Sequence, residues 1–319
     1  MIFFKNFCDY DYMLNFCLSM PLSKFQSHIS SIKGFFFAAA SAVCYGTNPL
    51  GALHLYEQGY LPDAVLFYRF LMAALLLFVV LVAKGSHFKI SFAEFKVLLV
   101  FGFLFASSSL PFYTSFNYMD AGLASTLLFL YPLEVAVLMA IFFKEKIKKW
   151  TWISIAISML GVALLYKGGG PTPLNPIGLL FVFISSLAYA IYMVMANFVN
   201  LKMGAVKMTF YAICFCLVFL LLYSVILGSG MPPLLHETSS LGWSFMLGLV
   251  PTTLSLIFMV KAVKIIGSTP TAILGALEPI TAVSIGVLVF NEVLTTRLVV
   301  GIIFILASTT LIAITKTKK

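Results

Sequence analysis

The sequence predicts an all-α, polytopic membrane protein with ten transmembrane helices, arranged as two inverted five-helix repeats. Three observations carry this prediction: an apolar composition, ten long apolar runs, and an ordered set of matches between the two halves. Of the 319 residues, 61% are apolar and 10% are charged, against about 25% charged residues in a typical soluble domain. A soluble fold cannot bury so much apolar surface. The composition therefore excludes a cytosolic enzyme, a disordered chain and a disulfide-stapled secreted domain.

The apolar runs have the length of membrane helices, since a bilayer core needs about 20 residues per helix. They are too long for strands and lack the alternation of a membrane barrel. Short connections rich in Gly and Pro separate them,. We expect helices over residues 34–54, 63–83, 97–118, 121–143, 150–166, 177–198, 206–227, 243–260, 268–290 and 297–314,.

These helices divide the chain into four parts. Residues 1–33 form a polar leader, 34–166 a first repeat, 167–176 a linker loop and 177–315 a second repeat. The leader is a poor signal peptide and too polar for an eleventh helix. It is either a cytoplasmic tail or a segment upstream of a true start at Met20, and both readings stay open.

The basic residues sort to one side of the predicted helices. With the N-terminus inside, 17 of the 20 Lys and Arg residues fall on the cytoplasmic side, which is the orientation that the positive-inside rule favours. Lys167 and Arg297 fall outside, and Arg69 lies within the second helix. The net charge of +9 therefore indicates membrane orientation and not nucleic-acid binding. The inside set is Lys5, Lys24, Lys33, Lys84, Lys89, Lys96, Lys144, Lys146, Lys148, Lys149, Lys202, Lys207, Lys261, Lys264, Lys316, Lys318 and Lys319.

The two halves match in order along the chain. Gly34, Ser41 and Tyr45 recur 144 residues later as Gly178, Ser185 and Tyr189. Further matches pair Phe67-Tyr68 with Phe210-Tyr211, Gly102 with Gly248, Ser109 with Ser255, and Pro132 plus Glu145 with Pro279 plus Glu292. Five helices per half force the second half to enter the membrane in the opposite sense. Inverted repeats are typical of secondary transporters, which hold substrate near the midplane between the halves.

Short motifs in these positions resemble the drug/metabolite transporter superfamily, EamA type. They are Arg69-Phe-Leu-Met-Ala73, Leu277-Glu278-Pro279-Ile280 with Asn291-Glu292, and the first-half copy Leu130-Tyr131-Pro132-Leu133 with Lys144-Glu145-Lys146. The resemblance covers about residues 34–315. It implies a carrier that moves amino acids, other small metabolites or drugs across the membrane, often out of the cell. The first half departs from the second because Tyr131 replaces the Glu before proline and Glu134 follows three residues later.

Two carboxylates are expected near mid-membrane. Glu134 lies about 13 residues into its helix and Glu278 about 10 residues into its own, at roughly 1.5 Å rise per residue. A charge at this depth costs at least about 2.5–3.5 kcal/mol, so such residues face a cavity or a partner. One of them is a candidate for carrying a coupling proton, because burial favours the protonated form of a carboxyl group. The alternative is a protonated Glu bonded to a neighbouring helix carbonyl.

Arg69 is the one basic residue expected inside a span, roughly 9 Å deep. Three readings stay open: the side chain snorkels outward, pairs with Asp63, or binds a substrate carboxylate. Glu145 and Glu292 end their spans at opposite faces, where structural anchoring or gating by ion pairs is expected.

Prolines mark where backbone groups could be freed to face a cavity. Helix breaks are expected at Pro111, Pro132, Pro251 and Pro279. Their polar neighbours, and the repeat partners Tyr45 and Tyr189, are candidates for lining a substrate site, against the alternative of ordinary helix packing. The complete set of candidate substrate or coupling residues is Glu134, Glu278, Arg69, Tyr45, Tyr189, Asn48, Tyr113, Tyr131 and Thr252.

The leading interpretation is a secondary transporter, and not an enzyme, for a small polar or amphipathic metabolite, with protons as candidate coupling ions. Export by alternating access is expected, across a prokaryotic plasma membrane with both termini cytoplasmic. An importer, a channel and a non-transport membrane protein are the alternatives. No phosphate-binding Gly-x-x-x-x-Gly-Lys run, HExxH or Cys/His cluster occurs, so we expect no cofactor, no metal and no nucleic acid. The substrate, the coupling ion and the oligomeric state stay open.

The topology can be tested with a reporter enzyme fused after Lys319. If both termini are cytoplasmic, a reporter that is active only outside the cytoplasm gives no signal there, whereas the same reporter inserted after Lys167 is active. Strong activity from the C-terminal fusion would contradict the predicted orientation.

Overall fold

A computed structural model describes the chain over residues 22–144, 149–166, 175–199, 201, 203–227, 230–235 and 237–316. Within those ranges all regular structure is helical. The elements are α2 (Leu22–Gly46), α3 (Asn48–Glu57), α4 (Pro62–Ala83), α5 (Phe92–Ser115), α6 (Ala121–Leu128), α7 (Tyr131–Phe143), α8 (Lys149–Tyr166), α9 (Pro176–Phe198), α10 (Ala205–Ile226), α11 (Thr238–Leu247), η1 (Gly248–Leu254), α12 (Ser255–Ile266), α13 (Ser268–Leu274), α14 (Leu277–Phe290) and α15 (Thr296–Lys316).

Six described helical segments are long and apolar enough to cross a membrane. They are Pro62–Ala83, Phe92–Ser115, Ala121–Phe143, Pro176–Ala196, Ala205–Ile226 and Thr238–Ile266. Shorter apolar helices cover Lys149–Leu164, Leu277–Phe290 and Thr296–Leu311. Helix overlaps each of the ten predicted ranges, and the fold is that of a polytopic membrane protein. The number of crossings stays a prediction. Glu145, residues 1–21, most of the expected linker (167–174), and Lys146, Lys148, Lys167, Lys202, Lys318 and Lys319 lie outside the described residues.

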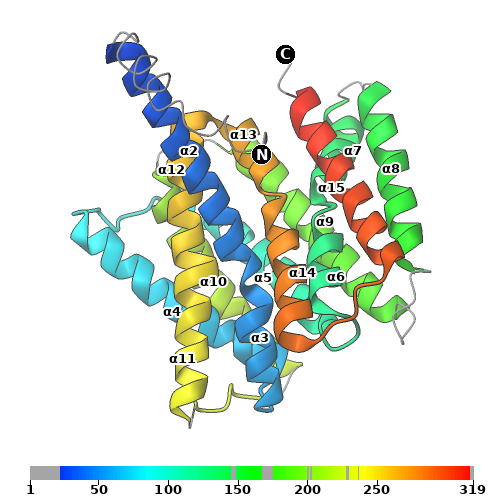
Figure 1. Ribbon diagram of the computed structural model, residues 1–319. Coiled ribbons are helices and arrows are strands. Elements are labelled where there is room, and N and C mark those ends of the chain that lie inside the picture. Colours follow the sequence, from blue (N-terminus) through cyan, green and yellow to red (C-terminus); the bar gives the residue numbers. More distant parts are fainter. Residues whose placement is uncertain are drawn as a thin grey trace, which may run out of the picture.

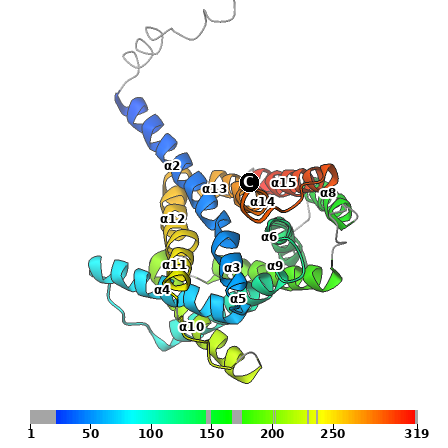
Figure 2. The ribbon, with the colours of Figure 1, turned by 60° about the horizontal axis from the view of Figure 1, so that its bottom comes forward.

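The helices form two groups, with α14 and α6 between them (Figure 1). One group contains α2, α4, α10, α11 and α12, and the other contains α7, α8, α9 and α15. α8 and α15 pack side by side at one edge, and α4 and α10 lie at the other edge (Figure 2). α2 runs along α12, while α6 packs against α14 between the two groups. The start of α2 and the end of α15 lie at the same end of the bundle (Figure 1).

Three predicted helices are interrupted. α2 stops at Gly46 and α3 begins at Asn48, where Thr47 donates to the carbonyl of Cys44 at 2.7 Å. α6 and α7 are separated just before Pro132, and α13 and α14 just before Glu278-Pro279. Proline has no N–H and is tolerated in a first helical turn, where that donor would be unpaired. The helix breaks expected at Pro132 and Pro279 therefore occur immediately before these residues.

The other two prolines do not break their helices. α5 continues through Pro111 to Ser115, so the predicted break there is wrong, since one lost backbone bond is offset by the packed helix around it. Pro251 lies inside the π-helical turn η1. The Thr252 hydroxyl donates to the Leu247 carbonyl at 2.9 Å, which satisfies the acceptor that a Pro251 N–H would otherwise bond in an α-helix.

Hydroxyl pairs join the first half to the second at two equivalent places. Ser41 on α2 and Ser255 on α12 each donate to the other's carbonyl, at 2.8 and 3.0 Å. Ser108 on α5 and Ser185 on α9 have hydroxyl oxygens 3.3 Å apart. All four side chains are buried. Each pair joins the first helix of one expected repeat to the third helix of the other.

Two glycines permit close helix approach in the same reciprocal manner. A Cβ at Gly102 on α5 would lie 2.4 Å from Cβ of Phe215 on α10. A Cβ at Gly248 in η1 would lie 2.6 Å from Cβ of Met72 on α4 and 2.9 Å from the backbone N of Ala73. These distances leave no room for a side chain, so α5 against α10 and η1 against α4 pack backbone to backbone.

Two tyrosines complete the reciprocal contacts between the halves. Tyr68 on α4 donates to the carbonyl of Pro233, in the connection between α10 and α11, at 2.8 Å. Tyr211 on α10 donates to the carbonyl of Phe88, in the connection between α4 and α5. Each connection is thereby held by the second helix of the other half.

Gly248→Ala tests the close approach of η1 to α4. The added methyl group would meet a Cβ and a backbone nitrogen, neither of which can move like the end of a side chain. We expect a destabilisation of about 1–3 kcal/mol from overpacking, seen as a lower thermal unfolding temperature in detergent. Gly242→Ala on α11 is the matched control because no atom lies within 4 Å of its added Cβ. Equal behaviour of the two variants would contradict the packing argument.

Candidate functional site

Arg69 organises a sealed polar network inside the bundle. Its side chain is only 3% exposed. Nε donates to Oγ1 of Thr252 at 3.0 Å, and Nη1 donates to the hydroxyl of Tyr113 at 2.7 Å. The Tyr113 hydroxyl in turn donates to Oδ1 of Asn48 at 3.2 Å, and Nδ2 of Asn48 donates to the Tyr45 carbonyl at 2.8 Å. We call Arg69, Thr252, Tyr113 and Asn48 the Arg69 network.

The network depends on backbone features already described. Thr252 reaches Arg69 because Gly248 lets η1 approach α4 to within contact of the Arg69 carbonyl. Asn48 faces the network from the first residue of α3, directly after the interruption at Thr47. Both halves of the chain therefore supply hydrogen-bond partners to one buried cation, which a low-dielectric interior requires.

Three aromatic rings lie close to the Arg69 guanidinium. Its Cζ lies 5.0 Å from the centroid of Phe70, 5.4 Å from that of Tyr113 and 6.0 Å from that of Tyr45. A cation at such distances from ring faces gains about 0.5–2 kcal/mol from each favourable contact. The rings thus substitute in part for the water that the bilayer excludes.

Glu278 and three tyrosines form a second, partly exposed group next to the Arg69 network. Glu278 lies in the first turn of α14 and within the electrostatic field of Arg69. Tyr131 and Tyr189 cross at 85° with ring centroids 4.8 Å apart, and both interact electrostatically with Glu278 and Tyr45. All four side chains are of intermediate exposure, whereas those of the Arg69 network are buried. We call these four residues the Glu278 group.

Glu134 belongs to a different environment. The hydroxyl of Ser186 on α9 donates to Oε1 of Glu134 at 2.8 Å. Oε2 is buried and has no hydrogen-bond partner among the described residues. Glu134 therefore faces α9 from α7. This arrangement favours a separate role from that of Glu278.

The structure brings together eight of the nine candidate substrate or coupling residues, in the Arg69 network and the Glu278 group, and leaves Glu134 apart. Sequence reasoning missed Phe70, which faces the guanidinium, and Tyr56, whose hydroxyl donates to the Tyr113 carbonyl at 2.9 Å. It also missed Ser186. Tyr192 is a further neighbour of the site, since its ring stacks on that of Tyr189 with centroids 6.0 Å apart. The sequence could have indicated it, because residues three apart on a helix share one face.

The sequence analysis also considered that Arg69 snorkels outward or pairs with Asp63, and the contacts of both side chains bear on these two interpretations. The side chain is buried among helices, which differs from a snorkelling arginine that reaches the membrane surface. Asp63 accepts a hydrogen bond from Ser224 at 2.7 Å. The partners described for the guanidinium are Thr252 and Tyr113, and the Tyr45 side chain interacts with it as well.

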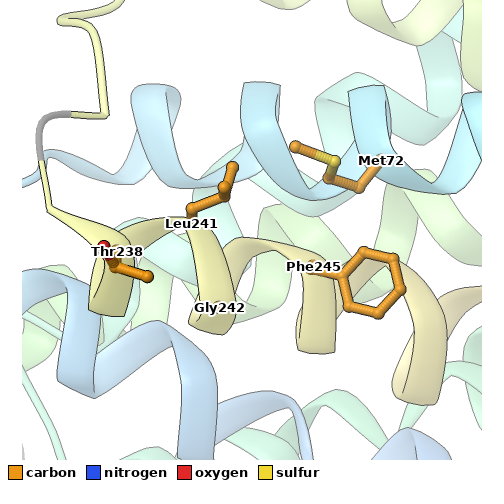
Figure 3. Close-up of a pocket in the computed structure, with 5 residues that line it drawn as sticks. All are labelled: Met72, Thr238, Leu241, Gly242 and Phe245. Carbon is orange, nitrogen blue, oxygen red and sulfur yellow. The ribbon is translucent and has the colours of Figure 1, made fainter.

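An apolar hollow lies between α4 and α11, with a volume of about 420 Å³ (Figure 3). It is lined by Met72, Thr238, Leu241, Gly242 and Phe245. None of these residues is charged, so this hollow suits hydrocarbon better than a polar solute. Among the described residues there is no group of three His, Cys, Asp or Glu side chains that could hold a metal ion.

The fold and the site define the class of an integral membrane transporter: a helical bundle of membrane-spanning length with a polar site supplied by both halves. The chain belongs to the EamA-like transporter family, whose sequence model matches residues 32–167 and again residues 176–314. The sequence model of the family thus matches this chain twice, once in each half.

Relatives in bacteria support the same class. The chain is 26% identical over 284 residues to the uncharacterized transporter YcbK of Bacillus subtilis, covering 84% of this chain and 88% of that protein. It is 24% identical over 290 residues to an uncharacterized transporter of Clostridium kluyveri, covering 86% and 91%. A solved crystal structure shares the fold, with a TM-score of 0.61 at 13% identity over 90% of this chain and 99% of that one.

Tyr113→Phe tests the Arg69 network. Removing the hydroxyl takes a partner from both Nη1 of Arg69 and Oδ1 of Asn48. Because one of these groups is charged and buried, we expect a loss of about 1–3 kcal/mol, measured as a lower thermal unfolding temperature in detergent. Tyr118→Phe is the control because Tyr118 is 39% exposed. Unchanged stability of Tyr113→Phe would contradict the network's structural importance.

Proposed function

We propose that this protein is a secondary carrier that exports a small polar or amphipathic, amino-acid-like metabolite by alternating access. The observation that carries the proposal is the interior pairing of a cationic network around Arg69 with a partly exposed carboxylate at Glu278. Charged groups at such depth are costly, and they persist where they serve a solute or a coupling ion.

Ten crossings in two inverted halves are part of this proposal. The reciprocal serine, glycine and tyrosine contacts support it, since each joins equivalent elements of opposite halves. The twofold match to one family supports it as well. An even number of crossings is in keeping with the start of α2 and the end of α15 lying at one end of the bundle. The lysine distribution assigns that end to the cytoplasm.

The chemistry of the site favours a solute with both charged and apolar parts. A planar guanidinium suits a carboxylate, and Arg69 presents it between aromatic rings. Glu278 with Tyr45, Tyr131 and Tyr189 suits an ammonium group, by ion pairing and by ring faces. Such a solute meets opposite charges contributed by both halves.

We assign the coupling proton to Glu278 because it shares the site with Arg69. A carboxylate that alternates between a proton and a solute must lie where both can reach it, and Glu278 keeps partial exposure. Glu134, with its unpartnered Oε2 against α9, is the second candidate for the proton. The relatives in Bacillus and Clostridium support a prokaryotic plasma membrane as the location.

Metabolite profiling of cells with and without overexpression tests the class, the direction and the solute together. We expect one compound to fall inside the cells and to rise in the medium. Arg69→Met should abolish this difference or reduce it about 10–100-fold, the equivalent of a charged hydrogen bond worth about 1.5–3 kcal/mol. Lys264→Gln, an exposed charge on α12, is the control. Depletion from the medium would indicate import, and single-channel currents would indicate a channel.

The proton assignment is tested in proteoliposomes with the compound so identified. Glu278→Gln should transport it at a rate that no longer responds to an imposed pH gradient, because Gln cannot bind and release the proton. Glu134→Gln should keep the wild-type response. The opposite pattern would assign the proton to Glu134, and an unchanged response in both variants would remove proton coupling from either residue.

A further inference from the structure

Glu292 makes a contact between the halves that the polar site does not use. It follows α14, whose last residue is capped by Asn291 in the left-handed conformation, at φ 55°. The backbone N of Glu292 donates to the Gly286 carbonyl at 2.9 Å. This tight ending turns the Glu292 side chain back toward the first half of the chain.

The carboxylate of Glu292 caps a helix of the opposite half. Its Oε1 accepts from the backbone N of Ala121 at 2.9 Å, across 171 residues of sequence, and the Gly122 amide is a further donor. Asp120 occupies the N-cap position of α6 but makes no side-chain cap bond. A residue of the second half thus takes the place of the local cap that helix termini usually have.

Two glycines make space for this carboxylate. A Cβ at Gly286 would lie 2.0 Å from Oε2 of Glu292, and a Cβ at Gly122 would lie 3.0 Å from the same atom. Any larger residue at 286 would expel the carboxylate. α14 and α6, which belong to opposite halves, pack against each other here.

We propose that Glu292 is a proton-controlled latch that holds α14 against α6 and closes the bundle at the end opposite the start of α2 and the end of α15. This inference rests on the proposed alternating-access function. In Figure 1, α14 runs toward that opposite end before the chain turns to α15. Opening this end separates the two halves, and the Glu292 bond to α6 must then break.

Ionisable groups occur on the elements around Glu292, and among them Asp120 acts on its carboxyl group. Asp120 is at the start of α6, His54 and Glu57 are on α3, which packs against α14, and Arg297 is at the start of α15. Burial and the like charge of Asp120 raise the pKa of Glu292 to about 7, and the amides of Ala121 and Gly122 partly oppose this rise. Burial also raises the pKa of Asp120.

The sign follows from comparing the closed and open forms. In water the carboxyl group of Glu has a pKa of about 4.3, so the closed form binds the proton more tightly. Between about pH 4.3 and 7, the closed form therefore loses stability as the pH rises. The whole window corresponds to a change of roughly 500-fold in the ratio of closed to open forms. Acid at this face closes the latch, and alkali releases it.

Hydrogen exchange of the peptide covering residues 117–128 measures the latch directly, with the full-length protein in nanodiscs and rates corrected for intrinsic pH dependence. In the wild type, protection of the α6 amides should fall as the pH rises from about 4.3 to 7, with a midpoint roughly half-way through that window. Glu292→Gln keeps an acceptor but cannot ionise, so its protection should stay high and independent of pH. Glu292→Ala should be weakly protected at every pH.

Matched variants separate the latch from general loosening. Gly286→Ala should behave like Glu292→Ala because its methyl group displaces the carboxylate, whereas Gly242→Ala, with no atom within 4 Å, should match the wild type. Asp120→Asn should move the midpoint to lower pH. The proposal is overturned by a wild-type profile independent of pH, by a wild-type response in Glu292→Gln, or by an unchanged midpoint in Asp120→Asn. None of these readouts needs transport, so the latch can fail while the carrier function holds.

Discussion

The centre of this bundle depends on one constraint: the buried guanidinium of Arg69 needs hydrogen-bond acceptors. Arg69 is 3% exposed and directs two of its donors at Thr252 and Tyr113. An unpaired guanidinium among apolar helices would cost several kcal/mol. Three irregular features bring oxygen atoms to this cation. They are the π-helical turn at Pro251, the close contact of Gly248 with α4, and the interruption before Asn48. Local irregularities that would weaken an isolated helix are therefore the means by which the site is assembled.

Most of the helix positions could be predicted because an apolar run of about 20 residues has few alternatives in a membrane. Many polar residues inside those runs lie near one another, because water is scarce there, whereas Glu134 lies apart. The sequence could not distinguish prolines by their effects. Pro132 follows an interruption, Pro111 is absorbed within α5, and Pro251 is accommodated by a threonine hydroxyl. These outcomes depend on which neighbouring group can reach the freed carbonyl, which no sequence pattern records.

The two intramembrane glutamates show how rotation of a helix decides a residue's partners. Both lie in the first turn of a resumed helix, yet Glu278 shares the field of Arg69 while Glu134 meets Ser186 on α9. Glu278 lies one residue before Pro279, whereas Glu134 lies two residues after Pro132. This offset of three positions, at about 100° and 1.5 Å per residue, gives the two side chains different directions and depths. Structural anchoring or gating by ion pairs was expected of Glu292, and the structure gives it two backbone amides of α6 as partners. Backbone partners have no sequence signature, so this contact needed coordinates.

The reciprocal hydrogen bonds of Tyr68 and Tyr211 have a consequence for how the protein is synthesised and inserted. Each tyrosine holds a connection that belongs to the other half, and the serine pairs do the same for the helices beneath. As the ribosome delivers the chain, the first half enters the bilayer with these groups still lacking their counterparts. Its polar atoms then depend on lipid headgroups, water or an insertion factor until the second half arrives. Synthesis therefore includes an interval before these contacts can form, and the length of that interval is set by the speed of translation.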